Sequence, residues 1–268
     1  MTRTTLRAAA CLALSLTLAA RAAGDEVIRL TKDQDASGRL TRQERPFAFV
    51  TDPSTPSAGV ATLEYRLGFA SGMDAERPLP ADLTSAGGSH SFGFAYGLTS
   101  RWAPFASVTL HGEGRKANVL AGAKVLLGDP SAPLQASIAA AGLREAGGAY
   151  GLQVLGAASY DAGPLRIAGN VQGEKIFEQG RDELDLLVMA GASWRVGSAV
   201  RLGAEYVGQD LEALYEDEEA EGGARHLIGP SMSLDLDRGR YQLAVAGGFG
   251  LTRETPAALA RAQLAVSF

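Results

Sequence analysis

The sequence predicts an all-β protein, a transmembrane antiparallel up-and-down barrel of about twelve strands. Three observations predict this fold. Apolar and polar residues alternate with a period of two over many segments of about ten residues, the length that a tilted strand needs to cross a bilayer. Short turns alternate with longer connections along the chain. The last segment keeps the alternation up to a terminal Phe268.

The first element, residues 1–22, is predicted to be a signal peptide. Arg3 and Arg7 supply the positive charge, and "AAACLALSLTLAA" is an apolar run too short to span a bilayer. Ala20-Arg21-Ala22 fits the small-residue cleavage pattern. The one cysteine, Cys11, falls inside this peptide, so the mature chain is expected to contain no disulfide and no thiol ligand.

Residues 23–57 form a segment before the first strand, and it ends in the linker "TDPSTPS". Within it, "DQDASGRLTRQE" (residues 33–44) has the ligand spacing of a calcium loop, with Gly38 at the sharp turn. This stretch resembles a single EF-hand loop. The alternative is a plain acidic turn, because Pro46 would break the exiting helix and no second loop follows. The resemblance implies Ca²⁺ bound by Asp33, Asp35, Ser37, the backbone carbonyl of Arg39, Thr41 and Glu44.

The rest of the chain alternates in the way of half-buried strands. In "ATLEYRLGFA" (residues 61–70) the odd-numbered residues are apolar and share one face, while Thr62, Glu64 and Arg66 share the other. The same pattern predicts strands at 59–70, 90–98, 104–112, 117–127, 133–143, 149–160, 164–175, 184–196, 199–209, 225–236, 240–251 and 258–268.

The connections between these strands alternate in length. Those after the even-numbered strands are short, such as "GDPSA", "DAG" and the tight-hairpin sequence Asp237-Arg238-Gly239. Those after odd-numbered strands include "SGMDAERPLPADLTSAGGS" and the acidic "DLEALYEDEEAEGG", which we interpret as a solvated outer loop. An even number of strands places both termini of the barrel chain on the short-turn side.

The final segment "ALARAQLAVSF" alternates and ends on Phe268, and in this it resembles the assembly signal of Gram-negative outer-membrane barrels. The resemblance covers residues 58–268. It implies insertion in the outer membrane, contact with lipid and lipopolysaccharide, recognition of the last strand by the barrel-assembly machinery, and a periplasmic place for residues 23–57. A soluble β-sandwich also alternates, but the signal peptide, the loop asymmetry and the terminal Phe favour the barrel. Aromatic girdles are predicted from Tyr65, Tyr96, Trp102, Tyr150, Tyr160, Trp194, Tyr206 and Tyr241.

The inward faces are predicted to carry charged side chains among many small residues. Such a lining suits either a hydrated pore, in which arginines favour anions, or a closed lumen of internal salt bridges. Glu174 and Asp185 are expected on the same faces. The predicted pore-lining residues are Glu64, Arg66, Lys124, Arg166, Arg195, Arg201, Glu205, Arg240 and Arg261.

Three functions are compatible with this outline. The leading hypothesis is a porin-like passive channel for small solutes. The alternatives are a structural or adhesive barrel that binds a partner through its outer loops, and a lipid-modifying enzyme. Catalysis is not expected, because none of His90, His111 and His226 stands in a His-x-Ser pattern. Nucleic acid is not an expected partner, because the net charge is −5 and the sequence has no basic stripe with interleaved aromatics.

Overall fold

The computed structural model describes residues 45–71, 88–111, 117–178, 184–209, 225–251, 255 and 258–268, all of which belong to one compact unit, Thr41–Phe268. The predicted signal peptide 1–22 and the EF-hand-like loop 33–44 lie outside the described residues. Within the described part of the chain, no helix is long and apolar enough to cross a membrane.

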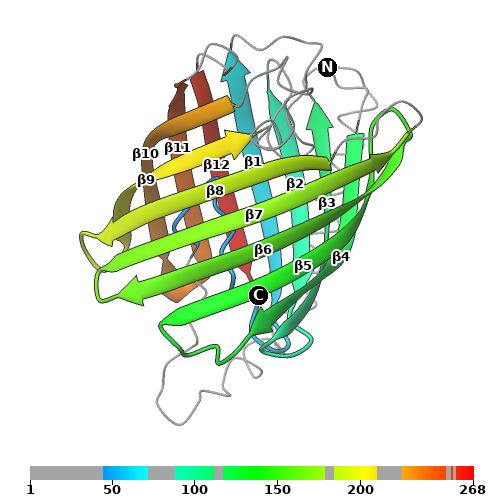
Figure 1. The fold of residues 1–268 in the computed structure, drawn as a ribbon. Helices are drawn as coiled ribbons and strands as arrows, with labels where there is room; N and C mark the ends of the chain where they lie inside the picture. Colours follow the sequence, from blue (N-terminus) through cyan, green and yellow to red (C-terminus); the bar gives the residue numbers. More distant parts are fainter. Residues whose placement is uncertain are drawn as a thin grey trace, which may run out of the picture. The chain divides into compact units, whose positions relative to one another are not determined.

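Twelve strands form a closed antiparallel barrel, as the alternation predicts (Figure 1). Their ends differ from the predicted ones by at most two residues. The strands are β1 (Ala61–Ser71), β2 (Ser89–Tyr96), β3 (Trp102–His111), β4 (Ala117–Leu127), β5 (Leu134–Arg144), β6 (Tyr150–Ala162), β7 (Leu165–Phe177), β8 (Leu184–Arg195), β9 (Val200–Gln209), β10 (Arg225–Leu236), β11 (Tyr241–Gly250) and β12 (Ala258–Ser267).

Each strand pairs with its neighbours in sequence, and β1 closes the barrel against β12. The closing register runs from Thr62 opposite Ser267 to Ser71 opposite Ala258. The terminal Phe268 continues this seam, because its backbone N–H donates to the Ala61 carbonyl over 2.9 Å. Closure leaves no unpaired sheet edge, which is the condition that a bilayer imposes on a spanning sheet.

The connections that follow the even-numbered strands are two to six residues long and lie at one end of the barrel, here called the turn end. The link between β6 and β7 needs only Gly163 and Pro164, with Gly163 at φ 61°. The link between β10 and β11 is the 3₁₀ turn Asp237–Gly239, in which Asp237 and Gly239 both have positive φ. This confirms the hairpin that the sequence "DRG" predicts. The opposite end is called the loop end.

The outer surface is apolar and the inner surface is polar, the reverse of a soluble protein. On β7, Ile167 and Val171 point outward and are about half exposed, while Arg166, Asn170 and Glu174 point inward and are buried. Exposed aromatic side chains mark both ends of the apolar band, as the girdles of membrane barrels do. They are Trp102, Tyr160, Trp194 and Tyr241 toward the turn end, and Phe69, Tyr150, Phe177 and Phe249 toward the loop end.

Candidate functional site

The lumen of the barrel is occupied by residues 45–57, which precede β1 and are called the lumen segment below. Its apolar run Phe47-Ala48-Phe49-Val50 is buried. These side chains pack into one apolar cluster in the lumen with inner-face residues of seven strands. The wall residues of this cluster are Ala70, Ala168, Leu187, Met189, Val207, Leu227, Ala244, Ala246 and Leu259.

The lumen segment starts and finishes near the turn end. Arg45 and Pro46 line a recess with Arg195, the last residue of β8, and with Ala199 in the turn that follows β8. At the other end of the segment, the Thr55 hydroxyl donates to the Ser100 carbonyl, in the turn between β2 and β3, over 2.9 Å. The residues between them reach up to Glu205, midway along β9. The segment is therefore a loop folded into the barrel from the turn end.

The strongest hold on the lumen segment is the side chain of Glu205. Its Oε1 accepts the backbone N–H of Ala48 over 2.9 Å, and its Oε2 accepts those of Phe49 and Val50 over 2.7 and 3.0 Å. These three N–H groups replace part of the hydration that the Glu205 side chain loses on burial, and none of the three donors is left unsatisfied in the lumen. Glu205 was predicted to line a pore, and in the structure it binds the backbone of the segment that fills the lumen.

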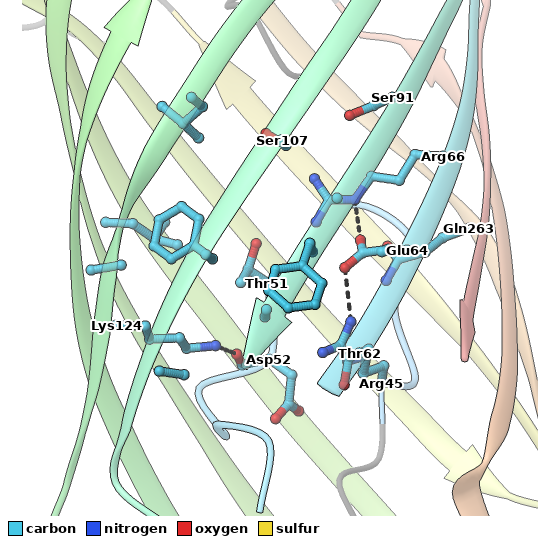
Figure 2. Close-up of a pocket in the computed structure, with 18 of the residues that line it drawn as sticks. Arg45, Thr51, Asp52, Thr62, Glu64, Arg66, Ser91, Ser107, Lys124 and Gln263 are labelled. Atoms are coloured by element: carbon cyan, nitrogen blue, oxygen red, sulfur yellow. Dashed lines mark hydrogen bonds and ion pairs between the residues drawn. The ribbon is translucent and has the colours of Figure 1, made fainter. Parts of the chain in front are cut away.

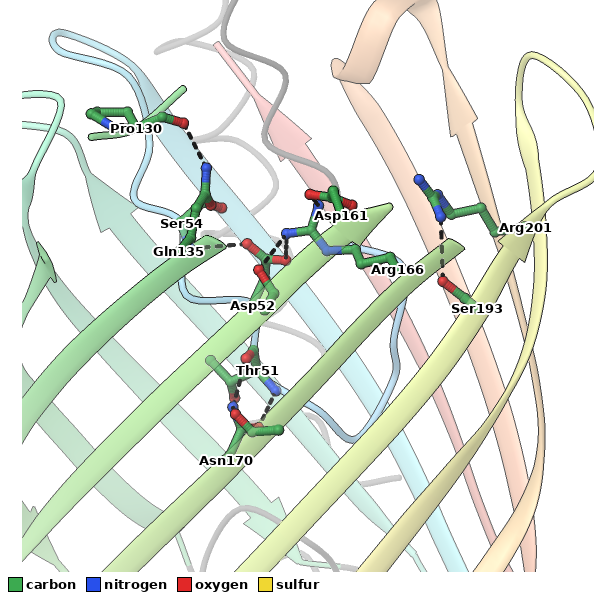
Figure 3. A network of polar contacts seen from close by, with 12 residues as sticks. Thr51, Asp52, Ser54, Pro130, Gln135, Asp161, Arg166, Asn170, Ser193 and Arg201 are labelled. Carbon is green, nitrogen blue, oxygen red and sulfur yellow. Dashed lines mark hydrogen bonds and ion pairs between the residues drawn. The ribbon is translucent and has the colours of Figure 1, made fainter. Parts of the chain in front are cut away.

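Asn170 on β7 binds the backbone of Thr51, the next residue of the segment, through the oxygen and the nitrogen of its side-chain amide (Figure 3). Its Oδ1 accepts the backbone N–H of Thr51 over 2.6 Å, and its Nδ2 donates to the Thr51 carbonyl over 2.8 Å. The backbone of Thr51 is thus paired as it would be in a sheet, but with a side chain of the wall.

Asp52 anchors the segment to the barrel wall with an ion pair. Its Oδ2 lies 2.6 Å from Nη2 of Arg166, and both side chains are buried. Arg166 also pairs with Asp161 over 3.1 Å and donates to the Ser159 hydroxyl (Figure 3). From β4, the Lys124 ammonium donates to the Asp52 backbone carbonyl.

We expect this ion pair to be strongly coupled. Asp52→Asn or Arg166→Gln alone should destabilise the folded protein by about 3–5 kcal/mol, because each removes the buried partner of the other charge. In Asp52→Asn, Arg166 keeps only its pair with the partly exposed Asp161. The double variant should lose clearly less than the sum of the two. Urea unfolding of the four proteins in lipid vesicles measures this coupling, and additive losses would show that the pair does not hold the segment.

Aromatic contacts fix the segment on its apolar side. A side-chain carbon at Gly191 on β8 would lie 2.7 Å from the ring of Phe47, so the absence of a side chain there makes room for the ring. The guanidinium of Arg261 on β12 lies over the ring of Phe49, 5.9 Å from its centre.

Near the start of the segment, Arg45 pairs over 2.8 Å with Glu64 on β1, which also pairs with Arg66 (Figure 2).

Most of the predicted pore-lining residues do lie on the inner wall: Glu64, Arg66, Lys124, Arg166, Arg201, Glu205 and Arg261. Arg195 lines a cavity at the turn end. Arg240 differs from the prediction. It lies in the turn before β11, where its side chain is exposed and covers the ring of Tyr241 with 5.5 Å to the ring centre, so it does not face the lumen.

Sequence reasoning missed the lumen segment and its contacts with Asn170. The available signal was the short apolar run "PFAFV" (residues 46–50) in an otherwise polar stretch. The run is too short for a strand pattern, so the sequence predicts only that it belongs to the segment 23–57 before the first strand. In the structure, residues 45–57 share one compact unit with the barrel, whereas the prediction separated the two at residue 58.

Two cavities remain beside the lumen segment. One, of about 160 Å³, lies between the segment and the inner faces of β1–β7 and β12. The other, of about 380 Å³, lies at the turn end and is lined by Arg166, Arg195, Arg201 and Asp161 among others. The described residues hold no group of three or more His, Asp or Glu side chains that could bind a metal ion.

The two histidines of β2 and β10 bind tyrosines. Nδ1 of His90 lies 2.7 Å from the Tyr65 hydroxyl, and Nδ1 of His226 lies 2.6 Å from the Tyr206 hydroxyl. Each imidazole also stacks on its tyrosine ring. Neither pairing is the serine–histidine contact that the enzyme alternative requires.

No protein-family model matches the sequence, and no curated protein matches it. Solved structures do match. The KdgM porin in complex with disordered oligogalacturonate has a TM-score of 0.54 at 8% identity, over 77% of this chain and 98% of that one. The COG4313 outer membrane channel from Pseudomonas putida F1 has a TM-score of 0.51 at 10% identity, over 81% of this chain and 98% of that one.

The chain has the fold of an outer-membrane porin. At these identities the likeness extends to the fold alone. The porin-like barrel of this chain is completed by a lumen segment whose backbone is bound by side chains from the barrel wall.

Proposed function

We propose that this protein is an outer-membrane channel through which small polar solutes diffuse passively, and that the lumen segment narrows the path. The observation that carries the proposal is a closed barrel with an apolar outer face and many charged side chains on its inner wall, with cavities remaining beside the segment. The names of the similar solved structures, a porin and an outer membrane channel, support it.

The membrane context of this proposal is the outer membrane of a Gram-negative bacterium. The apolar band and its two aromatic girdles fit contact with lipid and lipopolysaccharide. The pairing of β12 with β1 fits recognition of the last strand by the barrel-assembly machinery. The short-turn side, and with it the start of the lumen segment, then faces the periplasm. Calcium binding at residues 33–44 is a separate proposal about that side.

Planar-bilayer conductance of the refolded mature chain tests the channel. We expect discrete current steps that are small for a barrel of this size, because the segment fills the middle of the lumen. Millimolar calcium added on one side is expected to change these steps only if the loop 33–44 binds the ion. A protein that is folded and inserted, yet gives no current above the lipid background, would contradict the channel proposal.

A further inference from the structure

The cavity of about 160 Å³ beside the lumen segment has a surplus of positive charge. Four cationic side chains and two carboxylates line it. Both carboxylates are already paired: Glu64 with two of the lining arginines, and Asp52 with Arg166, which lies outside this cavity. The lining cations are Arg45, Arg66, Lys124 and Arg261.

Lys124 is a cation of this lining that contacts a backbone carbonyl and not a carboxylate. Its ammonium donates to the backbone carbonyl of Asp52, which is a neutral acceptor. Among the residues that the structure describes, no carboxylate forms an ion pair with Lys124. An ammonium carries three donors, so two of them remain to bind a further acceptor. A buried charge that no carboxylate contacts directly is costly, and an anion bound in the cavity would lower that cost.

Gln172 on β7 supplies a second donor to the same cavity. Its side chain is only 2% exposed, and its Nε2 has no hydrogen-bond partner among the described residues. Buried donors in native proteins nearly always have a partner, and a bound molecule is one of the usual reasons when the protein supplies none. The hydroxyls of Ser91 and Ser107 and the amide of Gln263 line the cavity as well (Figure 2).

We propose that this cavity is a binding site for small hydroxylated carboxylate anions. Lys124 and Gln172 donate to the carboxylate, and the serine hydroxyls and Gln263 bind the hydroxyl groups. The inference rests on the proposed channel function insofar as it makes this site the point where a permeating solute is selected. The positive charge and the hydrogen-bond donors of the lining favour an anion with polar groups. The volume of about 160 Å³ limits the solute to a small one.

Saturation-transfer NMR with the refolded mature chain in micelles tests the site without relying on conduction. The probes are sodium D-glycerate and glycerol, in which one CH₂OH replaces the carboxylate. We expect binding of glycerate at millimolar concentration and a signal for glycerol that is lower by on the order of tenfold, as loss of a hydrogen bond to a charged group predicts. Equal signals from the two probes would overturn the proposal.

Two variants assign the binding to the cavity. Lys124→Gln and Gln172→Met should each weaken glycerate binding, Lys124→Gln by on the order of tenfold, while glycerol stays unchanged. Lys175→Gln is the matched control, because Lys175 lies on the opposite face of β7 from Gln172 and does not line the cavity. Glycerate binding that survives both cavity variants would overturn the assignment.

Conductance separates this inference from the channel proposal. Glycerate binding in a chain that carries no current upholds the site and contradicts the channel. Current without preference for glycerate over glycerol in the NMR experiment upholds the channel and contradicts the site. If both hold, the ratio of anion to cation permeability in a KCl gradient should fall severalfold in Lys124→Gln.

Discussion

Glu205→Ala is expected to convert a narrow channel into a wide one. The substitution removes the three hydrogen bonds that hold the backbone of Ala48, Phe49 and Val50. Each lost bond leaves a buried N–H without a partner, which costs about 1–3 kcal/mol, so we expect a total loss of about 3–4 kcal/mol. That loss shifts the balance between the seated and the released segment by roughly 100- to 1000-fold.

The measurement is single-channel conductance in planar bilayers, with unheated gel mobility as the check that the barrel is folded. We expect larger current steps and a larger open fraction than in the wild type. Glu178→Ala is the control, because Glu178 is an exposed glutamate just after β7 and lines neither cavity beside the lumen segment. A folded Glu205→Ala protein with unchanged steps would show that the segment does not limit the current.

Val171→Arg is expected to impair folding into a bilayer severely. Val171 lies at the middle of β7, points away from the lumen and is 53% exposed. If the apolar band faces lipid, an arginine at this depth costs about 2–4 kcal/mol, because its charge lies in the hydrocarbon of the bilayer. Folding titrations with urea in lipid vesicles measure this free energy.

The matched control is the same substitution at the end of the same strand. Phe177 is the last residue of β7 and is also exposed, in the girdle at the loop end. Near the membrane surface an arginine costs about 0–1 kcal/mol, so Phe177→Arg should fold almost as well as the wild type. Equal costs at the two positions would refute the membrane orientation, since a water-soluble barrel has no dependence on depth.

The wall of the barrel was predictable from the sequence because its pattern is local. A strand between lipid and lumen must alternate apolar and polar residues, and the alternation in "ATLEYRLGFA" shows this without knowledge of any other strand. The same rule places Glu64, Lys124, Arg166 and Glu205 on the inner wall. It cannot say what they contact there, because the period of two fixes only the face on which a side chain lies.

Only the tertiary structure decided what fills the lumen. Three wall partners of residues 48–52, namely Glu205, Asn170 and Arg166, lie more than 100 positions away along the chain. No local pattern links "PFAFV" to these residues, because the contacts arise only once β7 and β9 are curved into one closed wall. Arg240 was also misplaced by the local pattern. It lies one residue before β11, and its side chain covers the ring of Tyr241 and does not face the lumen. The alternation does not tell at which residue a strand starts, and one residue decides the side on which a side chain lies. The sequence by itself determined the barrel and its two faces. The closed barrel then brought distant charged groups together around the lumen segment.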